Sequence, residues 1–189
     1  VVITQSLTFV ATCNAIHHMG AQPVFVDVSK STMGLCPKAL ELFLEENAVL
    51  EVNGSYLKSS KKRIRAVIPM HTYGHPVELD EIVVICKKWK LVLIEDAAES
   101  LGSFYKGRHT GTIGEFGAIS FNGNKVITTG GGGMVLCASE DPHIEDGLGR
   151  TASAIVQALE EGESTDGPKG TDGTDGPRRK PTLIVFPHP

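Results

Sequence analysis

Short apolar runs alternate with stretches of helical apolar spacing over the first three quarters of the chain. The runs are rich in valine and isoleucine and do not alternate with polar residues. They are too short for buried helices, so they are typical of strands covered on both faces. The predicted strands are 1–3, 24–28, 66–68, 91–94, 116–121 and 134–137.

Helices are expected between these strands. One covers 8–19 and another covers 78–89. A third begins at Pro37, as a first-turn proline. Ser6 or Thr8 is the expected N-terminal cap of the first helix, and Gly20 closes it. Residues 47–62 are polar and are interpreted as an exposed excursion. The alternation of strand and helix predicts an α/β fold, with a mostly parallel sheet and flanking helices.

The character of the chain changes after about residue 140. Residues 1–140 are expected to form the folded core, residues 141–161 an uncertain helical segment, and residues 162–189 a low-complexity tail. The tail repeats Thr-Asp-Gly and Asp-Gly-Pro and lacks the apolar surface needed to offset its ordering entropy, so disorder is predicted. The chain also begins on a strand-like run without Met, which favours a piece of a longer sequence.

Composition narrows the class of protein. Of the 189 residues, 41% are hydrophobic and 21% are charged, as in soluble globular proteins. A net charge of -4 gives no reason to expect nucleic acid or an anionic membrane as partner. The cysteines form no C-x-x-C pair, so free thiols in a reducing, cytoplasmic compartment are favoured over disulfides or zinc ligands. They are Cys13, Cys36, Cys86 and Cys137.

The candidate chemistry rests on an acid and a lysine. Asp96 ends one apolar run, and Lys125 follows a second one with glycines on both sides. Pyridoxal phosphate (PLP) catalysis uses this pair, because a lysine bonds the cofactor aldehyde and a carboxylate keeps the pyridine nitrogen protonated. Read singly, a strand-end aspartate is more often a cap or turn former, and a lone lysine is usually solvated. The choice between these interpretations therefore depends on the motifs around the two residues.

That pattern resembles the PLP-dependent nucleotide-sugar aminotransferases of the DegT/StrS type, which have the fold-type I aminotransferase architecture. The resemblance covers nearly three quarters of the chain and implies an incomplete large domain. It is carried by LTFVATCNAI, GAQPVFVDV, IPMHTYGHP and above all LIEDAAES followed by ISFNGNK and TTGGGGM.

The resemblance implies a role for each matching residue. Lys125 would be the Schiff-base lysine and would later carry a proton between the substrate Cα and the cofactor carbon. Asp96 would pair with the pyridinium nitrogen, and Glu99, where many relatives have Gln, would contact the ring-hydroxyl side. Ser120 would hydrogen-bond the cofactor phosphate. Phe9 would stack on the pyridine face, although an ordinary place in the helix core is its plainer interpretation.

Two other groups of residues, a glycine run and a pair of histidines, have structural interpretations. Gly130–Gly133 is interpreted as a tight backbone passage beside the candidate lysine, because glycine permits close approach and positive φ. The glycine spacings match neither the dinucleotide fingerprint nor the Walker loop. His71 and His75 are separated by Gly74 and followed by Pro76, which prevents a shared helix. A loop role is favoured there, and no metal site is predicted.

The implied activity is transfer of an amino group, with glutamate as donor, onto a nucleotide-linked 4-keto-6-deoxy sugar for surface polysaccharide or nonulosonic-acid synthesis. The amino-acid sequences of these motifs most resemble those of the branch that aminates UDP-linked 4-keto-N-acetylhexosamines. Membership of the family also implies a homodimer. One alternative is a catalytically silent α/β fragment, since a cofactor-phosphate segment and a small domain found in relatives are missing. The other is a PLP-type sugar dehydratase, against which Lys125 argues because such enzymes carry histidine there.

Overall fold

Residues 1–137 are described by the computed structural model, and the predictions for residues 141–161 and 162–189 lie outside this part of the chain. The helices are α1 (Val10–His18), α2 (Pro37–Asn47), α3 (Leu79–Lys88) and the short 3-10 helix η1 (Thr72–Gly74). The strands are β1 (Val2–Gln5), β2 (Pro23–Val26), β3 (Ala48–Glu51), β4 (Gly54–Leu57), β5 (Arg63–Ile64), β6 (Ala66–Ile68), β7 (Val92–Asp96), β8 (Phe104–Tyr105), β9 (Arg108–His109), β10 (Phe116–Ser120) and β11 (Gly133–Cys137).

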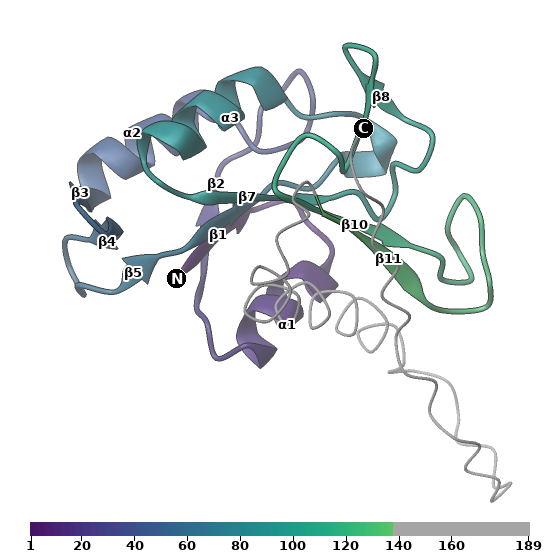
Figure 1. Ribbon diagram of the computed structural model, residues 1–189, viewed down its shortest axis with the longest axis horizontal. Coiled ribbons are helices and arrows are strands. Elements are labelled where there is room, and N and C mark those ends of the chain that lie inside the picture. Colours follow the sequence, from purple (N-terminus) through teal and green to yellow (C-terminus); the bar gives the residue numbers. More distant parts are fainter. Residues whose placement is uncertain (138–189) are drawn as a thin grey trace, which may run out of the picture.

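The main sheet has six strands in the order β11-β10-β7-β6-β1-β2 (Figure 1). Within this sheet β10, β7, β6, β1 and β2 are parallel to one another, and only the edge strand β11 is antiparallel, to β10. The predicted mostly parallel sheet is therefore confirmed. Because β7 and β10 are parallel neighbours, their carboxyl ends, at Asp96 and Ser120, meet at the same edge of the sheet.

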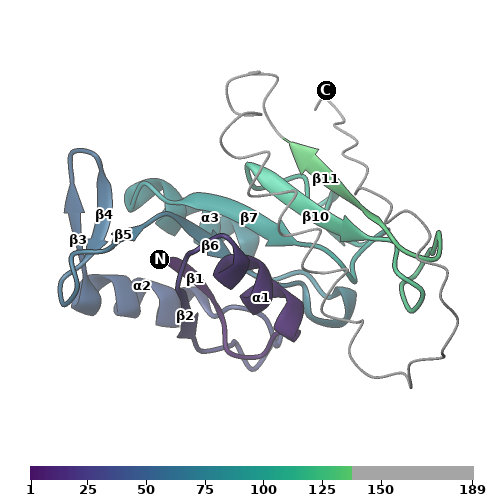
Figure 2. The same ribbon diagram turned by 90° about the horizontal axis from the view of Figure 1, so that it is seen from below.

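Helices cover both faces of this sheet, with α2 and α3 on one side and α1 on the other (Figures 1 and 2). Each face has its own hydrophobic cluster. The α2/α3 cluster includes Leu35, Leu40, Leu44, Leu79, Ile82 and Leu93. The α1 cluster is built from smaller side chains, including Ala11, Ala15, Ile16, Ile68, Ala98 and Ala118. Small residues let α1 pack close to the strands that end at the candidate site.

The predicted helices are confirmed, with ends shifted by one or two residues. Pro37 is the first residue of α2, where its missing amide hydrogen leaves no helical bond unmade. The predicted cap of α1 is wrong: Phe9 stands at that position, without a side-chain capping bond. Thr8 instead turns its hydroxyl inward to Thr12, at 3.1 Å. No helix within residues 1–137 is long and apolar enough to cross a membrane.

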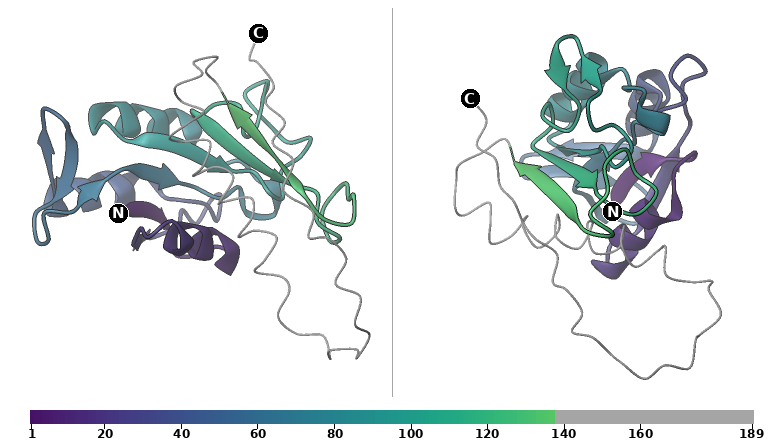
Figure 3. Two further views of the ribbon diagram at one scale, coloured as in Figure 1. Left: turned by 60° about the horizontal axis from the view of Figure 1, so that its bottom comes forward. Right: turned by 90° about the vertical axis from the view of Figure 1, so that its right-hand side faces the viewer.

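The excursion predicted for residues 47–62 contains regular structure, which corrects that interpretation. β3, β4 and β5 form a small antiparallel sheet, far from the loop between β10 and β11 (Figure 3). Val52 and Asn53 turn the chain between β3 and β4, and Gly54, the first residue of β4, has a φ of 135°. Ser55 is fully buried and donates to the Trp89 carbonyl at the end of α3. A short strand with polar residues carries little periodic signal, so the Asn-Gly dipeptide at the start of β4 was the local sign of a hairpin.

A second hairpin was also missed. β8 and β9 are two-residue strands joined by Lys106-Gly107, whose φ angles of 49° and 82° are both positive. Two positive φ angles suit a tight hairpin turn, because they match the right-handed twist of the strands. The hairpin stands on the connection from β7 to β10 (Figure 1).

Candidate functional site

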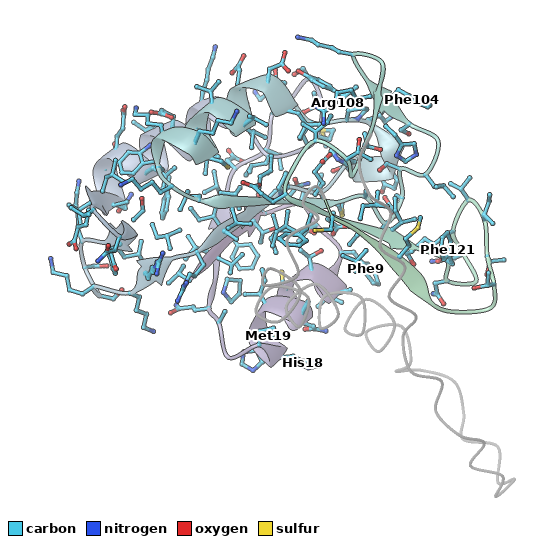
Figure 4. All side chains as sticks on the ribbon, in the orientation of Figure 1. Phe9, His18, Met19, Phe104, Arg108 and Phe121 are labelled. Carbon is cyan, nitrogen blue, oxygen red and sulfur yellow. The ribbon has the colours of Figure 1, made fainter. Side chains whose placement is uncertain are left out.

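The residues predicted from the sequence gather at the carboxyl edge of the parallel strands. Asp96 ends β7 and Ser120 ends β10, while Phe9 precedes α1 and Lys125 lies in the glycine-rich loop, residues 121–132. Phe9 and Phe121 are found at the same end of the sheet (Figure 4). Parallel α/β sheets bind ligands at this edge, because the connecting loops there are free to carry functional groups.

Lys125 is the centre of the cluster. Its side chain is 12% exposed, and Nζ lies 4.0 Å from Oε1 of Glu99. The same nitrogen is 5.9 Å from the centroid of the Phe9 ring, within the range of a cation–π contact. Three segments far apart in sequence thus bring an amine, a carboxylate and an aromatic face together.

Glu99 is fixed on its other side by a strained turn. Its Oε2 accepts a hydrogen bond from the Tyr73 amide at 2.9 Å. Tyr73 has a φ of 52° inside η1, a left-handed conformation that is uncommon for a residue with a side chain. Gly74 follows with a φ of 81°, and a Cβ there would stand 3.0 Å from the Glu99 carbonyl oxygen. Both the positive φ and this close contact therefore favour glycine at position 74.

Asp96 is buried and held at both oxygens. Oδ2 accepts from the Thr12 hydroxyl at 2.6 Å, and Oδ1 accepts from the Ala98 amide at 3.2 Å. Burial raises the pKa of Asp96 above its ordinary value, while these two hydrogen bonds and the charge of Lys125 act in the opposite direction. A carboxylate kept out of water in this way is suited to pair with a cationic group of a ligand.

Ser120 and the glycine-rich loop complete the edge. Ser120 is 6% exposed, and its Oγ accepts from the Asn122 amide at 3.3 Å. The Phe121 amide donates to the Gly132 carbonyl at 2.8 Å, which closes the loop. Gly130 and Gly132 have positive φ angles of 83° and 97°, as predicted. The close approach expected there is not found at Gly130 or Gly131, because no atom lies within 4 Å of where their Cβ atoms would stand.

The glutamate before Asp96 has a separate network that the sequence did not reveal. Glu95 is fully buried and accepts from His71 Nε2 at 3.0 Å and from the amides of Gly111, Ile113 and Gly114 at 2.8, 2.6 and 2.7 Å. Burial raises the pKa of Glu95, but the hydrogen bonds from His71 and the backbone outweigh it, so the pKa lies below its ordinary value.

His71 fits this network as a neutral donor. The Val77 amide donates to Nδ1 at 3.3 Å, so Nδ1 is the acceptor and Nε2 carries the proton that faces Glu95. His71 does lie in a loop, as predicted, and there it is buried and hydrogen-bonds Glu95 and the Val77 amide. Within residues 1–137 no group of three or more His, Cys, Asp and Glu side chains could hold a metal ion.

Gln5, also missed from the sequence, holds the loop that carries His71 and Tyr73. Its Oε1 accepts from the amides of Leu35 and Met70 at 2.9 and 3.0 Å, and its Nε2 donates to the Thr72 hydroxyl at 3.0 Å. Gln5 is fully buried, and each of these contacts satisfies a polar group that would otherwise be costly to bury. A glutamine at the carboxyl end of a short apolar strand is the signal that could have revealed it.

The chemistry of the cluster fits PLP. An amine can bond an aldehyde, a buried carboxylate can face a ring nitrogen that carries a proton, an aromatic side chain can cover a flat ring, and a hydroxyl can donate to a phosphate. Lys125, Asp96, Phe9 and Ser120 supply these groups at one edge of the sheet.

The groups at this edge fit a PLP-binding α/β domain, and comparison with known proteins identifies its family. Residues 1–148 match the family model described as the DegT/DnrJ/EryC1/StrS aminotransferase family, and the chain belongs to this family.

Three similar proteins illustrate the family. EpsN of Bacillus subtilis, whose name describes a pyridoxal phosphate-dependent aminotransferase, is 48% identical over 74% of this chain and 33% of its own length. GDP-perosamine synthase of Escherichia coli O157:H7 is 38% identical over 71% of this chain and 33% of its own length. The structure of Helicobacter pylori PseC, an aminotransferase involved in pseudoaminic acid biosynthesis, is 26% identical with a TM-score of 0.59, covering 82% of this chain and 34% of PseC. The chain thus spans about a third of these relatives.

Proposed function

We propose that this chain is the cofactor-binding part of a PLP-dependent aminotransferase that acts on a nucleotide-linked 4-keto-6-deoxy sugar, with glutamate as amino donor. The observation that carries the proposal is the position of Lys125 Nζ, 4.0 Å from Glu99 and 5.9 Å from the Phe9 ring centroid, at the edge where Asp96 is buried. In this proposal residues 1–140 are a partial large domain.

Each residue has a proposed part in holding PLP. Lys125 bonds its aldehyde, Asp96 faces the pyridine nitrogen, and Glu99 contacts the ring-hydroxyl side. Ser120 donates to the phosphate, and Phe9 covers one face of the ring. The cofactor itself supplies an electron-accepting ring for chemistry at the carbon that bears the amino group.

The chain's own groups then manage protons and water. Lys125 would hold and move a proton at its Nζ, and a well-placed general base contributes about 10²–10⁴-fold in rate. Asp96 stabilises a proton on the ring nitrogen, because its charge lies in a site shielded from water. Phe9 keeps water from one face of the ring. Glu99 places a carboxylate 4.0 Å from the lysine nitrogen.

The substrate class is supported by the relatives named above, which include a GDP-perosamine synthase and an aminotransferase of pseudoaminic acid biosynthesis. We propose a UDP-linked 4-keto-N-acetylhexosamine as the sugar, a bacterial surface polysaccharide or nonulosonic acid as the destination, and a homodimer in the cytoplasm as the working form. Lys125 continues to argue against a sugar dehydratase.

Borohydride reduction tests the proposal. The purified chain is incubated with PLP, reduced and mapped by mass spectrometry. A pyridoxyl group is expected on Lys125, absent from Lys125→Ala and weaker in Asp96→Ala, with Lys87→Ala as a control that changes an exposed lysine. No label, or label spread over Lys58, Lys61 and Lys87, would contradict the proposal and leave the silent fragment as the better description.

A second assay addresses the substrate. The chain is incubated with PLP, glutamate and either a UDP-linked 4-keto-N-acetylhexosamine or a GDP-linked 4-keto-6-deoxy hexose, and products are weighed by mass spectrometry. The amino sugar is expected from the UDP substrate. Amination of the GDP sugar alone would overturn the proposed sugar while keeping the aminotransferase class. Label on Lys125 without either product would locate the substrate contacts outside this chain.

A further inference from the structure

We propose that Thr12 is a positioning residue for Asp96, and that Thr8 extends it into a chain of hydroxyl groups directed at the buried carboxylate. The inference rests on the proposed function in one respect, because it takes Asp96 as the group that faces the cofactor's ring nitrogen. No motif in the sequence pointed to either threonine in this role.

The contact between Thr12 and Asp96 is short and shielded. Thr12 lies in the first turn of α1, is fully buried, and donates from Oγ1 to Asp96 Oδ2 at 2.6 Å. Hydroxyl-to-oxygen distances of about 2.5–2.7 Å are typical of a charged acceptor. A buried hydroxyl without a partner is costly, and the surrounding α1 face is otherwise alanine and isoleucine. The threonine is therefore matched to the carboxylate.

Thr12 fixes the orientation of the Asp96 carboxylate more firmly than the other contacts of that carboxylate do. The Ala98 amide reaches Oδ1 at a longer 3.2 Å, from a residue two positions along the same chain. Thr12 comes from the opposite side, across 84 positions of sequence. His71 and Lys125 are titratable groups that also act on Asp96. Held between a helix and its own loop, the carboxylate cannot rotate without losing the shorter bond.

Thr8 extends the series of hydrogen bonds that ends at Asp96. Its Oγ1 lies 3.1 Å from Thr12 Oγ1 and 3.5 Å from Met70 Sδ. When Thr12 gives its only proton to Asp96, its oxygen can still accept the proton of Thr8. Hydrogen bonds arranged in series strengthen one another. The series favours the ionised carboxylate, because a donor directed at the charged form stabilises that form.

The test compares matched threonine variants in the cofactor-free chain. Thr12→Val removes the hydroxyl and keeps the shape, Thr12→Ser keeps the hydroxyl, and Thr8→Val removes the second donor. Thr4→Val is the control, since Thr4 is also fully buried but donates to the Ile68 carbonyl, at 2.8 Å. The pKa of the Asp96 carboxyl is followed by carbon-13 NMR, with Asp96→Asn to assign the signal and circular dichroism to confirm folding.

The expected result is a higher Asp96 pKa in Thr12→Val, a smaller rise in Thr8→Val, and values close to the unaltered chain in Thr12→Ser and Thr4→Val. In the same variants, PLP binding followed by absorbance is expected to weaken about tenfold for Thr12→Val, the size typical of losing a hydrogen bond to a charged group. Thr12→Ser is expected to restore it.

Two results would overturn the proposal. One is an unchanged Asp96 pKa in folded Thr12→Val. The other is a Thr12→Ser variant that behaves like Thr12→Val, which would assign the role to the methyl group and its packing. The NMR titration needs no cofactor, so it stands even where the unaltered chain takes no PLP. Failure of the proposed function and failure of this inference are therefore separate observations.

Discussion

Glu95 and Asp96 are neighbours on β7, yet they belong to two different regions of the molecule. Successive side chains on a strand point to opposite faces of the sheet. Glu95 meets His71 and the 111–114 loop, while Asp96 meets Thr12 of α1, on the side of the α1 cluster. Both carboxylates are buried, but the pKa of Glu95 lies below its ordinary value and that of Asp96 lies above.

The difference teaches how to separate a structural acid from a functional one. Glu95 is surrounded by four donors, so its charge is satisfied within the fold and stabilises it. Asp96 has fewer donors, and burial outweighs them. A buried carboxylate with a raised pKa is stabilised by a cationic ligand group, because such a group supplies the opposite charge and hydrogen bond that the fold does not provide.

The largest effect is expected on the Asp96 side. Lys125→Ala removes the amine, and activity of the PLP-loaded protein is expected to fall by at least about 10³-fold, because both the covalent anchor and the general base are lost. Folding should be unaffected, since the contact to Glu99 is a partly exposed 4.0 Å pair of little energetic weight. Turnover assays and thermal melts check this, and a melt well below that of the unaltered chain would show that Lys125 also supports the fold.

On the Glu95 side the expected loss is in stability. Glu95→Gln leaves His71 and three amides facing a weaker, uncharged acceptor, and the free energy of unfolding should fall by about 3 kcal/mol at neutral pH. Because the folded-state pKa lies below the ordinary value of 4.5, this stabilisation is present above about that pH and is lost as the pH falls through the folded-state pKa.

Urea unfolding of both proteins at a series of pH values measures this difference. The two free-energy curves should approach one another in acid. A gap that stays constant down to pH 3 would mean that the charge of Glu95 contributes nothing and that only its shape matters.

A backbone change should produce a moderate effect at the junction of the two regions. Gly74→Ala adds a Cβ at a φ of 81° and 3.0 Å from the Glu99 carbonyl oxygen, which should cost about 1–3 kcal/mol and loosen the Tyr73 contact to Glu99. Urea unfolding and PLP titration check both effects. Gly107→Ala is a matched control, since it has a similar φ of 82° with nothing within 4 Å of the added Cβ. Equal losses in the two variants would assign the effect to φ alone.

The smallest effect sharpens the contrast with Glu95. Above its ordinary value of 3.8 the ionised form of Asp96 makes folding less favourable, because the folded-state pKa is raised. Asp96→Asn should therefore leave stability at neutral pH unchanged or slightly higher, while PLP binding weakens. Thermal melts with and without PLP measure the two effects. A clear loss of stability in the absence of PLP would place Asp96 with Glu95 among the structural acids.

The sequence was informative where local pattern and chemistry coincide. Short apolar runs predicted the strands of the main sheet, and Pro37 predicted the start of α2. The small β3–β4–β5 sheet was missed because its strands are short and partly polar, and the cap of α1 was assigned to the wrong residue because Thr8 bonds Thr12 instead. Local signals of this kind are weak, and tertiary contacts override them.

By itself, the sequence determined that an acid and a lysine follow successive strands of a mostly parallel sheet, and the fold then brings them to one edge. Only the tertiary structure decided which of two adjacent acids lies on the α1 side, bonded to Thr12, and which is bonded to His71 and the backbone of the 111–114 loop. The reason is physical: the partners that distinguish them, Thr12 for Asp96 and His71 for Glu95, lie 84 and 24 positions away. No local pattern encodes such pairs, because they exist only once the strands have paired.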